Sequence, residues 1–535
     1  MNKNAKILFA LLLVFLMIFS VVSCSAKQQT GNGTNSENTA DSSTAGTNAD
    51  INAPASDANT DRALNVAVSL DSGTLHPLYV TGAGGFLNIV TTYMEPLYDT
   101  NADGSRLWIL ATALDWVSDI QYTLRIREGV TFSNGNPLTA EDVLFTMELC
   151  AAHPQAFLNV KAVDFEKTKV VDEYTIDLWY TEYNAAQEPG LSQMMIMDKE
   201  SYDEAELARN PIGTGAYTVT DYVVNSHVFV DAREDYWGET PKIKKVNFYV
   251  ANEDAQRINA IETGDVDMAS IPLKDAEFAE AQGYVVTSVS AGVAITANFN
   301  MTPDGVLGTK EARYAVSHAI DRQSIADIVY AGKAKVLSWP ISESAVDFEP
   351  RFANAHETYS VGYDPEIAKE YAEKSGLIGQ TVRIITNGAP DNSTIAELIQ
   401  SNLLDIGVDA KITNYDQATY FGILMDESQY DIALFNPSAP SIMAVDILSM
   451  YPTFITQGWS GPERDEFGTV SQRAITTYDA KARGDLINEF LRIFLEADLW
   501  YGLCEGVSIR AYSADLRGVE FTLAGGIYYQ NVYFA

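Results

Sequence analysis

The sequence predicts an α/β protein, with mixed helices and strands, that is divided into more than one lobe. Between Thr381 and Ile412 a strand, an amphipathic helix ended by Gly407 and a second strand follow one another, the pattern of a parallel strand–helix–strand unit. A helix that starts near Asp254 and ends at Gly264 leads into another strand in the same way. Apolar residues continue to the end of the 535-residue chain, which is too long for one comfortable hydrophobic core. We therefore expect two or three lobes.

A further helix is expected directly after Thr139, because Thr-Ala-Glu-Asp is a sequence that can form a capping box. Val143, Met147 and Cys150 then fall on one helical face, so we expect the Cys150 side chain to be buried. An exported protein can join two such thiols, and the sequence leaves open whether Cys150 and Cys504 form a disulfide.

The N-terminus has the layout of a secretion signal. Two lysines, Lys3 and Lys6, precede an apolar run from residue 7 to residue 19, which is too short to span a bilayer comfortably. The run leads into Val-Val-Ser-Cys, which resembles a bacterial lipobox and implies cleavage after residue 23 and lipid attachment at Cys24. An ordinary secretory signal that happens to hold a cysteine is the alternative.

Residues 24–63 are expected to be a disordered tether between the lipid and the folded body. They are almost wholly Ser, Thr, Asn, Ala, Gly and Asp, and such a segment cannot bury enough apolar surface to offset its ordering entropy. A long polar tether indicates a Gram-positive-type envelope, with the protein on the outer face of the bacterial cytoplasmic membrane.

Charge and motif content exclude several functions. The formal net charge is −37, whereas a nucleic-acid-binding protein needs a basic footprint. The five histidines are scattered, and neither a zinc-type nor a phosphate-loop motif occurs, so no catalytic residue, metal site or cofactor is expected. Gly-Trp-Ser-Gly-Pro at 458–462 lacks the final glycine of a nucleophile elbow and is interpreted as a turn. Nothing in the sequence supports an enzyme.

Ten stretches, taken in order, resemble the family 5 extracellular solute-binding proteins, the peptide, nickel and related receptors of ABC importers. They are LHPLY (75–79), MEPLYDTNADG (94–104), YTLRIREGVTFSNGNPLTAEDVLFTMEL (122–149), PIGTGAYTV (211–219), REDYWGETPKIKKVNFYV (233–250), AIETGDVDM (260–268), NFNMT (298–302), EARYAVSHAIDRQSIADIVYAGKA (311–334), YDPEIAKEYAEKSGL (363–377) and IQSNLLDIGVDAKI (399–412). Within them, Gly213 and Gly215 are expected to adopt backbone conformations closed to other residues.

The resemblance implies a two-lobe periplasmic-binding-protein-like fold of type II, with two chain crossings and an extra inserted subdomain. The expected parts are a signal peptide at 1–23, the tether at 24–63, a first lobe at 64–100, 206–289 and 505–535, the inserted subdomain at 101–205 and a second lobe at 290–504. It also implies a monomer that captures a peptide or peptide-like small molecule between its lobes by hinge closure. The expected partners are the permease subunits of an ABC importer with their ATPases.

One departure from the family bears on the ligand. Peptide-binding members often carry a Trp-x-x-Asp-Tyr element whose Asp takes the ligand's ammonium group, whereas this chain reads FNPSAPSIMAVDILSMY at 435–451. Asp446 is the nearest acid, so we expect either that Asp446 reaches the cleft or that the ligand is a modified peptide, a glycan or a chelate. The candidate ligand-binding residues are Tyr79, Gly82, Gly84, Gly85, Asn436, Ser438, Asp446 and Trp459. A signalling or chaperone-like surface lipoprotein is the other alternative.

The lipobox assignment can be tested by changing Cys24→Ala. Because the thioether forms on the cysteine sulfur, the variant should incorporate no lipid and should accumulate as precursor or shed protein. Metabolic labelling with a fatty-acid analogue measures this. Label that persists in the variant, or that is absent from the unaltered chain, would contradict lipidation at Cys24.

Overall fold

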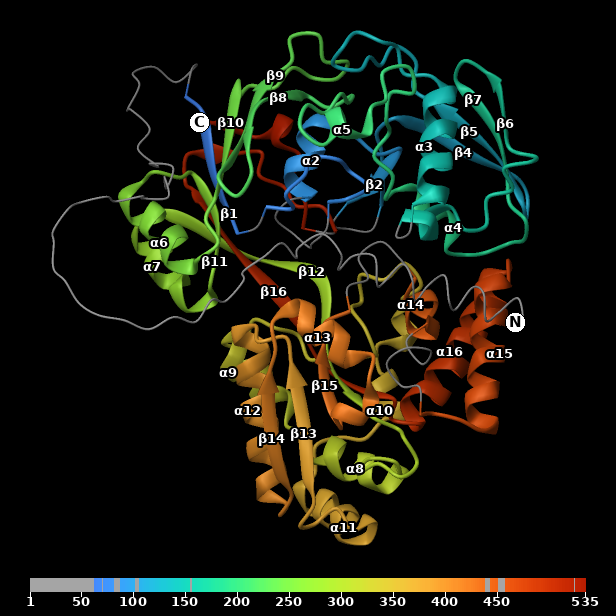
Figure 1. Cartoon of the computed structure of the whole chain (residues 1–535), viewed down its shortest axis with the longest axis vertical. Coiled ribbons are helices and arrows are strands. Elements are labelled where there is room, and N and C mark those ends of the chain that lie inside the picture. Colours follow the sequence, from blue (N-terminus) through green and yellow to red (C-terminus); the bar gives the residue numbers. More distant parts are fainter. Residues whose placement is uncertain are drawn as a thin grey trace, which may run out of the picture.

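The computed structural model describes residues 62–69, 71–80, 87–101, 105–153, 156–437, 443–450, 458–523 and 525–535. These residues form two lobes, one above the other in Figure 1. We call the described residues up to 290 and from 507 onward the upper lobe, and residues 294–505 the lower lobe. The predicted signal peptide, Cys24 and nearly all of the predicted tether lie outside the described residues.

One ten-stranded sheet runs through both lobes. Its strand order is β14 (Asp409–Asn414), β13 (Thr381–Thr386), β15 (Ile432–Phe435), β12 (Tyr284–Phe299), β16 (Trp500–Ser513), β11 (Met268–Ile271), β1 (Leu64–Val68), β10 (Lys245–Val250), β9 (His227–Ala232) and β8 (Tyr217–Val223). The first three strands belong to the lower lobe, the last five belong to the upper lobe, and β12 and β16 join the lobes (Figure 1).

The pairing of β12 with β16 carries the chain between the lobes twice. The two strands are antiparallel from Tyr284, opposite Ser513, to Asn298, opposite Trp500, and their register shifts between Ser290 and Ala294. Gly292 lies in this shift with a φ of 64°, a left-handed conformation that suits glycine at a bulge. The sheet therefore bends at the level where the lobes meet.

The predicted strand–helix–strand unit is confirmed in the lower lobe. Strands β13 and β14 are parallel, with Thr381 opposite Asp409, and helix α12 (Pro390–Asp405) connects them. The upper lobe confirms the second sequence pattern, because α6 (Asp254–Thr263) ends at Gly264 in a left-handed conformation and leads into β11.

A separate four-stranded sheet lies at the outer edge of the upper lobe. Its order is β4 (Ala111–Ser118), β5 (Gln121–Ile126), β7 (Thr175–Trp179) and β6 (Lys169–Asp172), and α3 (Ala140–Ala152) packs beside it. The backbone N–H of Thr139 donates to the Asp142 carboxylate at 2.8 Å, as the capping sequence predicted. We call residues 111–191 the outer subdomain. Its core is distinct from the one beneath β1 and β10.

The remaining elements cover the sheets or form the lobe surfaces. In the upper lobe they are α2 (Leu87–Tyr93), α4 (Gln187–Leu191), α5 (Glu204–Leu207), α7 (Ala276–Ala281), β2 (Tyr98–Thr100), β3 (Arg106–Trp108), β17 (Leu516–Arg517) and β18 (Tyr533–Phe534). In the lower lobe they are α8 (Lys310–Ala319), α9 (Arg322–Tyr330), α10 (Ala355–Tyr359), α11 (Pro365–Ser375), α13 (Gln417–Leu424), α14 (Ala444–Met450), α15 (Pro462–Thr476) and α16 (Ala480–Glu496).

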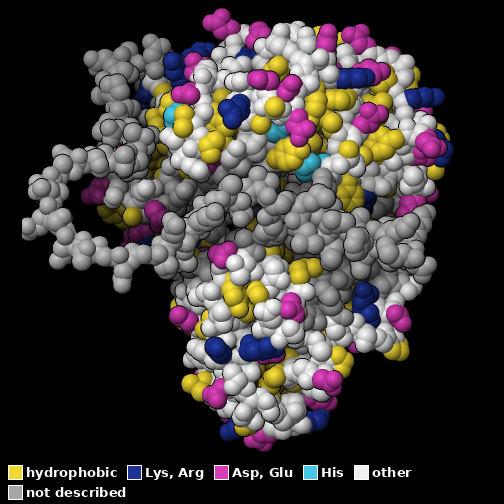
Figure 2. Space-filling model, in the orientation of Figure 1, with side chains coloured by type: hydrophobic (Ala, Val, Ile, Leu, Met, Phe, Trp, Pro, Cys, Tyr) yellow, Lys and Arg dark blue, Asp and Glu magenta, His cyan; other side chains and the backbone are white. Residues whose placement is uncertain are grey.

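Both cysteines in the described residues are buried free thiols. Cys150 packs in the core of the outer subdomain, as its place on the helical face predicted, and Cys504 packs in the lower lobe. No helix within the described ranges is both long enough and apolar enough to cross a membrane. On the face shown in Figure 2, acidic side chains are spread over both lobes rather than gathered in one patch.

Gly213 and Gly215 are needed for a different reason from the one predicted. Neither residue is among those with a positive φ, so their backbone is open to other residues. A Cβ atom on Gly213 would instead lie 2.1 Å from the carbonyl oxygen of Tyr93, and one on Gly215 would lie 2.4 Å from that of Thr92. Close approach of two backbone segments, rather than a special conformation, requires glycine at both positions.

This packing predicts the effect of Gly213→Ala. The added methyl group must displace the end of α2, so we expect the free energy of unfolding to fall by about 3 kcal/mol, the upper part of the range for overpacking a core. Gly422→Ala is the matched control, because its new Cβ meets nothing within 4 Å and it lies in helix α13. Urea denaturation should show the control unchanged or slightly more stable. Equal stability of the two variants would contradict the close-approach explanation.

Candidate functional site

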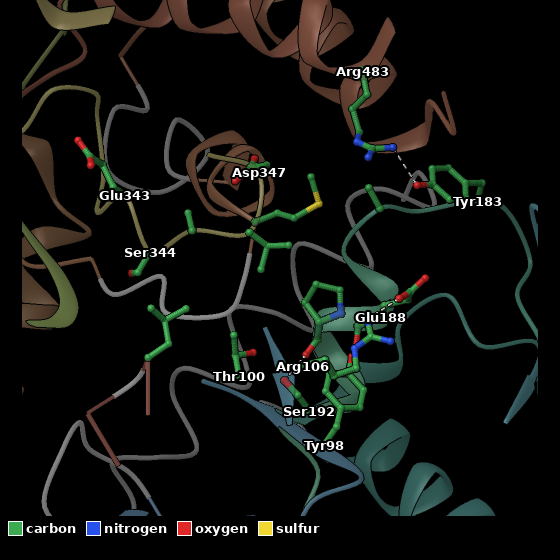
Figure 3. A pocket seen from close by; sticks show the side chains of 16 residues that line it. Tyr98, Thr100, Arg106, Tyr183, Glu188, Ser192, Glu343, Ser344, Asp347 and Arg483 are labelled. Atoms are coloured by element: carbon green, nitrogen blue, oxygen red, sulfur yellow. Dashed lines mark hydrogen bonds and ion pairs between the residues drawn. The ribbon is translucent and has the colours of Figure 1, made fainter. Parts of the chain in front are cut away.

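A cavity of about 670 Å³ lies between the lobes (Figure 3). Its upper wall comes from β2, β3 and the segment around α4, and its lower wall comes from residues 343–347, Met443 and α16. The volume falls within the range of about 300–1,000 Å³ that is typical of small-molecule sites. Because both lobes line the cavity, its shape depends on how they are held together.

The upper wall combines an ion pair with aromatic surface. Arg106 on β3 is paired with Glu188 on α4 at 2.8 Å, and its guanidinium group lies 4.5 Å from the ring centroid of Tyr98. The Tyr98 hydroxyl donates to the backbone carbonyl of Glu188. Burial raises the pKa of Tyr98, so this phenol stays protonated as a donor. Thr100 and Ser192 add hydroxyl groups to the same wall.

The lower wall contains a buried carboxylate. Asp347 accepts hydrogen bonds from the backbone N–H groups of Ala444 at 2.7 Å and Val445 at 2.9 Å, at the start of α14. Burial raises the pKa of Asp347 to about 6, although these two donors act in the opposite direction. Glu343 completes the acidic side of the cavity, with its carboxylate 2.5 Å from the Lys335 ammonium group.

Arg483 connects the lower wall to the upper one. Its guanidinium group donates to the Tyr183 hydroxyl at 3.1 Å across the lobe boundary, as the dashed line in Figure 3 shows. It also donates to the backbone carbonyls of Thr477 at 3.0 Å and Tyr478 at 2.9 Å, which fix it at the start of α16. The cavity thus presents arginines, carboxylates, hydroxyls and aromatic rings, a set suited to holding a small polar ligand.

The chain can now be compared with known proteins. Residues 109–455, more than half of the chain, match the sequence model of the bacterial extracellular solute-binding proteins, family 5. The chain belongs to this family. It is a solute-binding protein and not an enzyme, as the resemblance implied, and its two-lobe type II fold is confirmed.

The relatives of this family 5 protein are distant. The oligopeptide-binding protein OppA of Bacillus subtilis is 22% identical over 98% of this chain and 99% of its own. The nickel-binding protein NikA of Staphylococcus aureus is 24% identical over 64% of this chain and 68% of its own. Among solved structures, the ABC transporter substrate-binding protein CtaP of Listeria monocytogenes has a TM-score of 0.80 and 22% identity, and the match covers 89% of this chain and 99% of CtaP.

None of the four described candidates from the sequence lines the cavity of this family 5 protein. Tyr79 is exposed, with its hydroxyl donating to Glu204 at 2.6 Å, and Asn436 is also exposed. Trp459 packs in the lower-lobe core, 5.2 Å from the ring of Phe467. Asp446 forms an ion pair with Lys161 of the upper lobe at 2.8 Å. Gly82, Gly84, Gly85 and Ser438 lie outside the described residues.

Sequence reasoning missed the residues that form the cavity of this family 5 protein. Arg106, Asp347 and Arg483 lie in segments without a distinctive motif. Asp347 stands in the polar stretch SESAVDFEPR (342–351), so nothing in the sequence marked its carboxylate as a buried one. The described residues contain no group of three or more His, Cys, Asp or Glu side chains that could hold a metal ion.

Asp347 should make the stability of this protein depend on pH. Its carboxyl group keeps a proton up to about pH 6 in the folded state, whereas an unfolded Asp loses it near pH 4. The protonated Asp347 carboxyl group therefore stabilises the folded state. This contribution to the free energy of unfolding is fully present below about pH 4 and is lost as the pH rises through about 6. In Asp347→Asn this pH-dependent loss is absent. The free energy of unfolding of the unaltered protein, taken relative to that of Asp347→Asn, should therefore fall by up to about 3 kcal/mol between about pH 4 and pH 6.

Urea denaturation at half-unit steps from pH 4 to pH 7 measures this difference. Asn also changes the hydrogen bonds to α14, which adds a constant offset but no slope. A difference between the two proteins that is the same at every pH would contradict a raised pKa for Asp347.

Proposed function

We propose that this protein is a lipid-anchored extracytoplasmic receptor of an ABC importer that captures a peptide or peptide-like ligand between its lobes and closes on it. The observation that carries the proposal is the cavity of about 670 Å³ with one wall from each lobe. A ligand there touches both walls, so it favours the closed arrangement by its differential affinity for that arrangement. For this receptor we propose the bounds expected from the sequence: a first lobe at 64–100, 206–289 and 505–535, an inserted subdomain at 101–205 and a second lobe at 290–504.

Two features support a peptide-like ligand. One relative, which matches along nearly its whole length, is named an oligopeptide-binding protein. The cavity also offers charges of both signs, with Arg106 on its upper wall and Arg483, Glu343 and Asp347 on its lower wall, which suits a ligand that carries both an acid and a base.

A metal chelate is the second candidate ligand. The NikA relative is named a nickel-binding protein, and guanidinium groups pair well with the carboxylates of a chelator. In this case the two cavity arginines would bind the organic shell rather than the metal.

The membrane anchor and the transporter partner belong to the same proposal. The lipobox at Cys24 supplies the anchor, and two or three acyl chains are enough to hold a protein of this size at a membrane surface. The receptor then delivers its ligand to permease subunits that work with ATPases, as a monomer.

Binding should depend on the upper-wall ion pair. In Arg106→Met the cavity loses a charged donor, and loss of a charge-assisted hydrogen bond weakens binding by roughly tenfold or more. Arg125→Met is the matched control, since Arg125 is paired with Asp115 at 2.8 Å on the sheet of the outer subdomain and neither residue lines the cavity. Titration calorimetry against a short-peptide library and against nickel–histidine measures both variants.

The expected result is binding of one ligand class, weakened in Arg106→Met and unchanged in Arg125→Met. Binding of neither class to the unaltered protein would refute the proposed function. Equal binding by both variants would contradict the proposal that the ligand binds in this cavity.

A further inference from the structure

The two lobes contact each other beside the cavity through side chains from the outer subdomain and from α14–α16. The contacting residues are Trp116, Lys161 and Tyr183 of the upper lobe and Asp446, Tyr478 and Arg483 of the lower lobe. We call these six residues the interlobe latch. We propose that the latch holds the receptor closed in the absence of ligand, with the Lys161–Asp446 ion pair as its principal contact; the inference rests on the proposed function.

The ion pair is made by both carboxylate oxygens. The ammonium group of Lys161 lies 2.8 Å from Oδ1 and 2.9 Å from Oδ2 of Asp446. The side chains are 27% and 24% exposed, so about three quarters of each is already removed from water. An ion pair of this kind is shielded from salt better than a fully exposed one, and separating the lobes would leave two charges without their partner.

An aromatic contact reinforces the ion pair at the rim. Trp116 on β4 stacks on Tyr478, with ring centroids 5.7 Å apart and an angle of 26° between planes. Tyr183 meets the same Tyr478 ring edge-on at 5.3 Å. The Ala185 N–H also donates to the Ile475 carbonyl at 2.8 Å, so the backbones of the two lobes are joined there as well. Aromatic pairs stabilise a contact beyond the area they bury.

The position of these contacts makes them independent of direct contact with a ligand. Trp116, Lys161, Asp446 and Tyr478 do not line the cavity, so a ligand bound there neither supplies nor replaces their contacts. Tyr183 and Arg483 do line it, and they link the latch to whatever binds there. Asp446, which the sequence suggested as an anchor for a ligand ammonium group, is instead bound by an ammonium group of the chain itself.

A closed form that is populated before binding changes what a ligand must do. The apparent affinity of a receptor is its intrinsic affinity multiplied by the fraction of molecules in the competent state. A latch that raises this fraction therefore tightens binding without a new ligand contact. The cost is slower entry, because the ligand reaches the cavity only when the latch opens. Lys161 is therefore a positioning residue, which acts on the ligand through the arrangement of the lobes.

The test measures the distance between the lobes without any ligand. Spin labels at Val171→Cys on β6 and Leu404→Cys on α12 report on opposite lobes, and both sites are exposed. Cys150 and Cys504 are buried and will not take label. The full-length chain carries Cys24→Ala in every variant, so that the third thiol takes no label. It is dialysed until native mass spectrometry shows only the ligand-free mass, and pulsed electron resonance then gives the distance distribution.

The unaltered protein should show mainly the closed distance. Lys161→Met and Asp446→Asn should each raise the open-to-closed ratio about fivefold, the double variant should add little, and Lys161→Arg should retain the closed distance. Lys167→Met is the matched control, because Lys167 pairs with Asp164 at 2.8 Å within the outer subdomain and does not reach the lower lobe. It should leave the distribution unchanged.

Two results would overturn the latch. One is a ligand-free protein in which the labels at positions 171 and 404 are only found further apart than these positions are in the structure. The other is a distance distribution that Lys161→Met and Lys167→Met change equally or not at all. Since no ligand enters the measurement, its outcome is independent of the calorimetry that tests the proposed function, and either proposal can fail while the other stands.

Discussion

Strands β12 and β16 pair along almost their whole length, and they are the only strands of the ten-stranded sheet that lie in both lobes among the described residues. Their side chains enter both cores: Phe299 and Tyr501 pack in the lower lobe, whereas Ile509 and Ala511 pack in the upper one. Each lobe is therefore completed by a strand pair that it shares with the other. Gly292 lies in a register shift of this shared ribbon, between the residues that pack in the two cores.

The cavity and the latch both follow from this connection. The lobe closure that we propose would act through this ribbon on the contacts between the lobes, among them the Lys161–Asp446 pair. Arg483 connects the cavity with the latch, because it lines the cavity and donates to the Tyr183 hydroxyl. In the proposed receptor, ligand contacts and lobe contacts therefore act on the same closure.

Local features of this structure were predictable from the sequence, and contacts between distant segments were not. The unit from Thr381 to Asn414 and the capped helix after Thr139 depend on side-chain periodicity within a few turns, and both were predicted. Family motifs then gave the fold class. The Lys161–Asp446 pair joins residues 285 positions apart, and no pattern near either residue announces it. Likewise an aromatic residue such as Trp459 looks the same in a sequence whether it packs in a core or faces a cleft.

The two buried thiols make the described cores insensitive to redox conditions. Burial raises the pKa of both Cys150 and Cys504 to about 12, so the reactive thiolate form is scarce at the neutral pH of a cell envelope. The two residues lie in separate cores and cannot meet without unfolding. The described part of each lobe thus keeps its structure without a disulfide, and a change between oxidising and reducing conditions leaves both cores as they are.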